Sequence, residues 1–117
     1  MLAHGAVLRS KFFSPEEVEA IARDYRSAGL SEVDVAVMAL AEKVTLNAYK
    51  VTEEDLEKLR AHGLADSDIL DIILAASARC FFSKVLDATG AEPDEEAYGT
   101  MAPELRVALV VGRPFGE

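Results

Sequence analysis

Cysteine is nearly absent from this chain of 117 residues, in which Cys80 is the only one. A single thiol cannot form a disulfide within the chain, and this agrees with a reducing compartment. Half of the residues are apolar, which is enough to build a core without disulfides or a bound metal. We therefore expect one globular domain over residues 1–117, in the cytoplasm.

Basic residues are also scarce, with 12 Lys and Arg against 21 Asp and Glu, a net charge of −9. Such a chain has no surplus of positive charge to neutralise the phosphates of nucleic acids or anionic lipids. The longest apolar run, residues 72–78, is far shorter than the roughly 20 residues that span a bilayer. We expect neither nucleic acid nor a membrane as a partner.

Several motifs that carry chemistry are missing. The sequence has no glycine-rich phosphate loop, no dinucleotide fingerprint and no Ser/His/Asp pattern. Its acidic clusters, residues 16–17, 53–55 and 94–96, have no His or Cys at metal-ligand spacing, and two of them coincide with expected helix starts. We therefore expect no metal and no cofactor.

Cap and turn signals predict helices and leave almost no room for strands. Residues 1–11 resemble a helix without a start signal. Ser14-Pro15-Glu16-Glu17 is a capping box that predicts a helix over 15–28, which Gly29 ends. Ser31 caps a predicted helix over 32–48, whose apolar residues recur every three to four positions, as in a core helix.

The second half of the chain repeats this plan. Thr52 opens a helix that ends at His62-Gly63, and Asp66 or Ser67 opens the longest helix, to about residue 88, which Gly90 ends. Residues 91–96 are predicted to be an exposed acidic connection, and a last short helix covers 103–111. The two halves predict an all-α bundle built from two helix hairpins.

The longest predicted helix is apolar nearly all round from Ile69 to Ala78, which places it in the centre of the bundle or at a subunit interface. Phe12-Phe13 and Phe81-Phe82 are adjacent aromatic pairs. Neighbours on a helix point about 100° apart, so both members of a pair cannot easily enter one small core. We expect one of each pair to reach an interface between subunits of a homo-oligomer.

Five segments of the chain form an ordered set: Ala3-His4-Gly5 and residues 40–45 (LAEKVT), 51–56 (VTEEDL), 69–73 (ILDII) and 81–90. In this order they resemble the alkylhydroperoxidase D-like branch of the carboxymuconolactone decarboxylase superfamily. The resemblance implies an oligomeric helical fold of which residues 1–117 are the C-terminal portion. It also implies a thiol peroxidase lineage, in which a small hydroperoxide is attacked by one cysteine of a Cys-x-x-Cys pair and a histidine relays protons.

Of that catalytic set only His4 has a counterpart here, as the proton relay, because the cysteine pair would lie before Met1. We therefore expect this polypeptide to belong to the peroxidase lineage without running the reaction itself. Two alternatives stay open: a non-enzymatic helical oligomerisation or interaction module, and a carboxymuconolactone decarboxylase-like enzyme that needs no redox pair.

Four other residues are of a type that can carry chemistry: Cys80, His62, Lys43 and Glu42. Cys80 has Arg79 and Lys84 as neighbours, which could lower its pKa, but a lone cysteine in an apolar helix is more often a buried small hydrophobe. His62 is expected to interact with free carbonyls at a helix end. Lys43 and Glu42 are expected to be solvated, with Glu42 able to face a neighbouring helix in an assembly.

Overall fold

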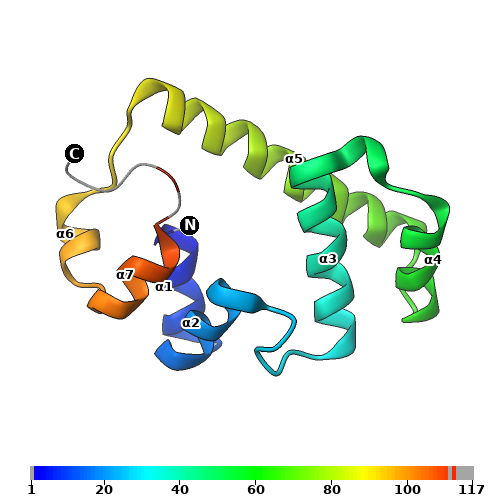
Figure 1. Cartoon of the computed structure of the whole chain (residues 1–117), viewed down its shortest axis with the longest axis horizontal. Helices are drawn as coiled ribbons and strands as arrows, with labels where there is room; N and C mark the ends of the chain where they lie inside the picture. Colours follow the sequence, from blue (N-terminus) through cyan, green and yellow to red (C-terminus); the bar gives the residue numbers. More distant parts are fainter. Residues whose placement is uncertain (1, 111, 113–117) are drawn as a thin grey trace. The chain divides into compact units, whose positions relative to one another are not determined.

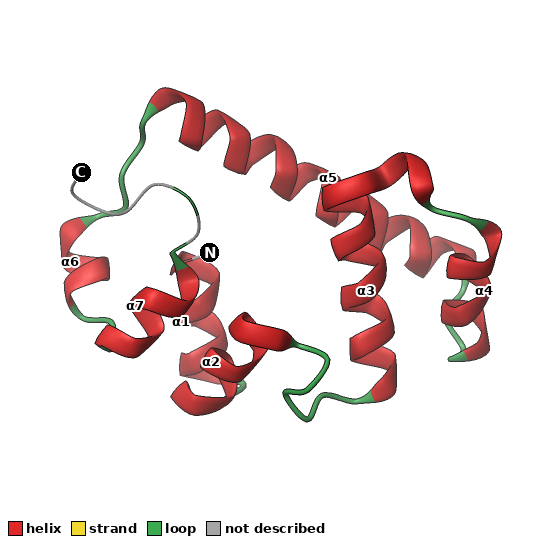
Figure 2. Cartoon of the chain, viewed as in Figure 1, coloured by secondary structure: helices red, strands yellow, loops and turns green. Residues whose placement is uncertain are grey.

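The computed structural model describes residues 2–110 and 112, and every regular element in that part of the chain is helical (Figures 1 and 2). The all-α prediction is confirmed. In chain order the elements are α1 (Leu2–Lys11), α2 (Pro15–Asp24), α3 (Glu32–Asn47), the 3₁₀ turn η1 (Ala48–Lys50), α4 (Glu53–Ala61), α5 (Asp66–Thr89), α6 (Glu95–Gly99) and α7 (Pro103–Leu109).

Contacts divide the chain into two compact units. Unit 1 consists of Met1–Gly29 together with Ala91–Glu117, and unit 2 is the continuous segment Leu30–Gly90. The two helices of the first expected hairpin, α2 and α3, therefore fall in different units, so that hairpin is not seen. The second, α4 and α5, lies within unit 2.

Unit 1 is built on α2 and α7, with α1 against both. Its core contains Val18 of α2 and Leu105 of α7, each 2% exposed. Gly5 brings α1 close to α7, because a Cβ atom at this position would lie 2.5 Å from Leu109 Cδ1. Phe13 packs against the same cluster, whereas Phe12 is 69% exposed.

Unit 2 is built on α3 and α5, with α4 against both. Its fully buried residues come one from each helix: Leu40 of α3, Leu59 of α4 and Ile69 of α5. Half-buried apolar side chains of the same helices, among them Val37 and Ile72, pack around these three. Each helix thus contributes one anchor to a single small core.

The local signals act as the sequence predicts. The Ser14 capping box is complete: the Glu17 N–H donates to Ser14 Oγ at 3.2 Å, and the Ser14 N–H donates to Glu17 Oε2 at 2.7 Å. Ser31 Oγ accepts from the Asp34 N–H at 3.1 Å. After α4 the chain turns at Gly63, whose φ of +89° lies in the left-handed region that favours glycine.

Two predicted boundaries are wrong. The helix over 15–28 ends at Asp24, because the Asp24 carboxylate accepts hydrogen bonds from the Arg26 N–H at 3.1 Å and the Ser27 hydroxyl at 2.8 Å, which favours a turn. Residues 91–96 are not all connection, since α6 begins at Glu95. The expected helix start at Met1 lies outside the described residues, and the last helix, expected to reach about residue 111, ends at Leu109.

The long helix α5 is less buried within the chain than its apolar sequence predicts. Only Ile69 is fully buried, and the neighbouring Leu70 and Leu74 are 54% and 55% exposed. Phe81 and Phe82 are both exposed as well, at 72% and 51%. Within unit 2, α5 is therefore covered on one side only, and a position at a subunit interface stays a prediction.

Truncating Leu105 tests the core of unit 1. Leu105→Ala removes a fully buried side chain and should lower the free energy of unfolding by about 2–5 kcal/mol. Val107→Ala, in the same helix but at a position 73% exposed, should change it by less than about 0.5 kcal/mol. Urea unfolding of both variants measures the difference, and equal values would contradict the described packing of α7.

Candidate functional site

His4, the predicted proton relay, lies on the outer side of α1. Its side chain is exposed, while the next residue, Gly5, is buried against Leu109. Cys80 lies on α5 in the other unit and is half-buried rather than buried as expected. The only thiol of the sequence and His4 are therefore not brought together within one unit.

Titratable side chains do not gather into a metal site in the part of the chain that the structure describes. No group of three or more His, Cys, Asp or Glu side chains there could hold a metal ion. At the end of α4, the Leu59 carbonyl accepts a hydrogen bond from the Leu64 N–H at 3.3 Å, and the Arg60 carbonyl accepts one from the Gly63 N–H at 2.8 Å. These bonds fill the role expected of the His62 side chain, which is exposed.

The acidic start of α4 is tied to α3 by Lys43 and Asp55. Lys43 Nζ lies 2.5 Å from Asp55 Oδ2, and the two side chains are 33% and 20% exposed. The same carboxylate oxygen accepts from the Thr52 N–H at 2.8 Å and so caps the helix. The expectation that Lys43 is simply solvated is wrong.

These two contacts explain the acidity of Asp55. The hydrogen bond from Lys43, followed by the one from the Thr52 N–H, lowers the pKa of Asp55 from its ordinary 3.8 to about 2. Both favour the charged carboxylate over the neutral acid. Asp55 therefore joins two helices as a permanent anion at neutral pH.

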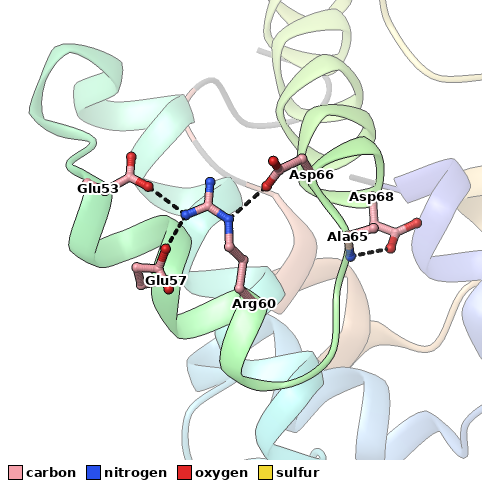
Figure 3. Close-up of polar contacts among 6 residues, drawn as sticks. All are labelled: Glu53, Glu57, Arg60, Ala65, Asp66 and Asp68. Atoms are coloured by element: carbon pink, nitrogen blue, oxygen red, sulfur yellow. Dashed lines mark hydrogen bonds and ion pairs between the residues drawn. The ribbon is translucent and has the colours of Figure 1, made fainter.

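Arg60 holds the second acidic cluster together (Figure 3). Its guanidinium forms ion pairs with Glu53 at 2.5 Å, with Glu57, and with Asp66 at 2.7 Å, so it links α4 to the first residue of α5. These carboxylates raise the pKa of Arg60 further above its already high value. One positive and three negative groups leave a net charge of −2 on this surface.

Figure 3 also shows how α5 begins. The Ala65 N–H donates to Asp68 Oδ2 at 2.7 Å, which satisfies one of the backbone donors that a helix start leaves free. The acidic residues at the starts of α4 and α5 thus serve as caps and ion-pair partners. These carboxylates therefore have a structural role at the helix starts.

The most unusual surface is an apolar row on α5, which we call the outer stripe: Leu70, Leu74, Phe81 and Val85. At 100° per residue these four side chains fall within about 60° of one another around the helix axis. They are 54%, 55%, 72% and 44% exposed. Ile69 and Ile72, which pack against the core of unit 2, lie on the opposite side of the helix.

Small residues occupy the middle of the outer stripe. Ser77 and Ala78 are exposed and lie between Leu74 and Phe81 on the same side of α5. Next to the stripe, Phe82 is 51% exposed. The Arg79 guanidinium lies over the Phe82 ring, with its Cζ atom 5.6 Å from the ring centroid. The outer stripe therefore has large apolar side chains at both ends and small side chains in its middle.

A scan against protein-family models and a search of curated proteins both find no match to this chain. Within the described residues, no helix combines the length and apolar character needed to cross a bilayer.

Sequence reasoning missed the outer stripe, although its signal is present. Apolar residues 70, 74, 81 and 85 follow helical spacing, but Ile69 and Ile72 on the opposite side and Ile73 between the two sides conceal it. Only the position of α3 shows which of the two apolar faces is covered. The Lys43–Asp55 contact has no sequence signal, because its partners come from separate helices, 12 residues apart.

Acid titration tests the Lys43–Asp55 contact. Because the folded pKa is lowered, the stabilising effect of Asp55 is present above pH 3.8 and is lost as the pH falls towards about 2. Asp55→Asn should therefore be less stable than wild type at pH 6. This difference in stability should disappear as the pH falls from 3.8 to about 2. Thermal unfolding across that range measures it.

Glu54→Gln is the matched control. It removes a carboxylate from the same turn of α4, but one that is 81% exposed and paired only along the helix with Lys58. Its stability relative to wild type should change little over the same pH range. An Asp55→Asn variant that behaves in the same way would contradict the described contact.

Proposed function

We propose that this chain is a non-enzymatic helical module that associates with a second copy of itself through the outer stripe of α5. The observation that carries the proposal is the exposure of Leu70, Leu74, Phe81 and Val85 in one row. Single exposed apolar side chains are common on protein surfaces, but a contiguous row is typical of an interaction site.

The strength of such an association can be estimated. Full burial of one of these side chains is worth about 1.5–3 kcal/mol, so covering four half-exposed side chains on each of two protomers gains roughly 9 kcal/mol. Lost translational and rotational freedom costs at least about 4 kcal/mol. At most ~5 kcal/mol remains, which corresponds to a Kd of about 0.2 mM or weaker. We therefore expect a concentration-dependent dimer.

The alternative is the alkylhydroperoxidase D-like lineage predicted from the sequence resemblance. The exposed position of His4 on a helix and the all-helical fold support it. A peroxidase of this type needs a reactive thiolate and a second thiol to resolve the sulfenic acid, and the chain has one cysteine. We expect no catalytic turnover by these 117 residues.

Activity assays separate the alternatives. Hydroperoxide reduction that Cys80→Ser abolishes would support a peroxidase and contradict the non-enzymatic proposal. Lactone turnover that thiol reagents do not inhibit would support the decarboxylase side of the superfamily. The self-association proposal expects neither activity.

Charge in the outer stripe should abolish self-association. Leu74→Glu places a carboxylate in the apolar row, where its desolvation opposes association. Wild type should shift from monomer to dimer between about 10 and 500 μM in sedimentation equilibrium, a range that overlaps the expected Kd. Leu74→Glu should remain monomeric over the same range.

Val107→Glu is the control, because Val107 is 73% exposed but lies on α7 of unit 1. It should dimerise as wild type does, and far-UV circular dichroism should show that both variants keep their helices. A wild-type chain that stays monomeric throughout, or a Val107→Glu variant as defective as Leu74→Glu, would contradict the proposal.

A further inference from the structure

We infer that two copies of α5 pair antiparallel about a two-fold axis near residue 75, with Leu70 of each copy against Phe81 of the other. This inference rests on the proposed self-association and specifies its geometry. Three observations carry it: the spacing of the outer stripe, its small central residues, and the charges beside it.

The spacing of the outer stripe fits an antiparallel pair. When Leu70 lies opposite Phe81 of the second copy, Leu74 lies opposite residue 77 and close to Leu74 of that copy. Ser77 and Ala78 then line the middle of the contact, where small side chains let two helices approach closely. The largest side chain of the row, Phe81, meets the medium-sized Leu70 at each end.

The charges beside the stripe match the same register. Asp66 and Lys84 are 18 residues apart, which is five full helical turns, so both lie on the same side of the stripe. A two-fold axis perpendicular to the helix pair keeps that side common to both copies. Lys84 of one copy therefore lies beside Asp66 of the other, and the reverse pair forms at the opposite end.

The surface around Asp66 is suited to an additional positive charge. Asp66 is 79% exposed although it pairs with Arg60, and the group it forms with Glu53, Glu57 and Arg60 carries a net charge of −2. Lys84 is exposed near the other end of α5. The acidic beginning of one helix thus meets the lysine of its partner.

A parallel pair is disfavoured by the same charges. In register, the two-fold axis runs along the helices and exchanges the two sides of the stripe, so Asp66 of each copy would face Asp71 of the other, and like charges in such positions oppose association. It would also align two helix dipoles in the same direction, whereas antiparallel helices place opposite partial charges side by side. The antiparallel arrangement replaces these repulsions with two attractive pairs.

Disulfide trapping distinguishes the arrangements, in a Cys80→Ser background with oxidised glutathione as the oxidant. A disulfide requires Cα atoms about 4.4–6.8 Å apart. In the antiparallel pair, the two copies of residue 70 are about 16 Å apart along the axis, at 1.5 Å per residue. Leu70→Cys alone should therefore not form covalent dimers, whereas Leu70→Cys with Phe81→Cys should.

Asp87→Cys controls for random collision, because Asp87 is exposed but lies away from the outer stripe. Sedimentation of each reduced variant reports whether it still associates. A covalent dimer from Leu70→Cys alone, as abundant as from the double variant, would overturn the antiparallel geometry and leave self-association standing. No covalent dimer above the Asp87→Cys level, from variants that still associate, would place the interface elsewhere. A wild-type chain that stays monomeric would overturn both proposals.

Charge reversal tests the same register without cysteines. Lys84→Glu should weaken dimerisation about three- to thirtyfold, because two pairs are lost and each is worth about 0.2–1 kcal/mol before the new repulsion is counted. Lys58→Glu makes the same change in net charge on α4, at a side chain 63% exposed, and should alter the Kd less than about twofold. Equal effects of the two variants would contradict the Lys84–Asp66 pairing.

Discussion

The contact of Leu40, Leu59 and Ile69 is the point on which unit 2 depends, because each of its main helices contributes one residue there. The contact also sets a limit. With 24 residues, α5 is about 36 Å long, while α3 with 16 residues is about 24 Å and α4 with nine is about 14 Å. Two shorter helices on one side of α5 cannot cover an apolar surface that continues on the other. The outer stripe is what α3 and α4 leave uncovered within unit 2.

The acidic excess has a separate structural explanation. Asp55 caps α4 and binds Lys43, Arg60 joins α4 to Asp66 of α5, and Glu17 closes the capping box of α2. Carboxylates at helix starts interact favourably with the positive end of the helix dipole. The charge of the chain therefore reflects how its short helices begin, and the ends of these helices are fastened by side chains rather than by a large core.

Local features of this fold could be predicted from the sequence, and long-range ones could not. Ser14 and Ser31 mark helix starts because their hydroxyls accept hydrogen bonds from backbone N–H groups three residues on. Gly63 marks a helix end because it adopts the left-handed conformation of the turn. The early end of α2 was missed although its cause, the Asp24–Ser27 contact, is also local. The exposure of the α5 face was missed for a different reason. Which apolar face is covered depends on where α3 packs. The sequence of a helix that is apolar on both sides does not indicate which side that will be.

The candidate site follows the same division. The sequence placed His4 on a helix, and the structure describes a helix there with the histidine exposed. It gave no indication that the only cysteine would lie in the other unit. A reaction that needs a thiol beside a histidine depends on tertiary proximity, which residue spacing within helices does not determine. The exposed face of α5, by contrast, needs only a second copy of the same chain.

The most direct test of this account is a dilution series followed by amide chemical shifts in ¹⁵N-labelled protein, from about 500 μM downward, through the expected Kd. The account predicts concentration-dependent shifts concentrated along residues 70–85 of α5, with α1, α2 and α7 unchanged. Shifts that do not change with concentration, or that change mainly in unit 1, would contradict it.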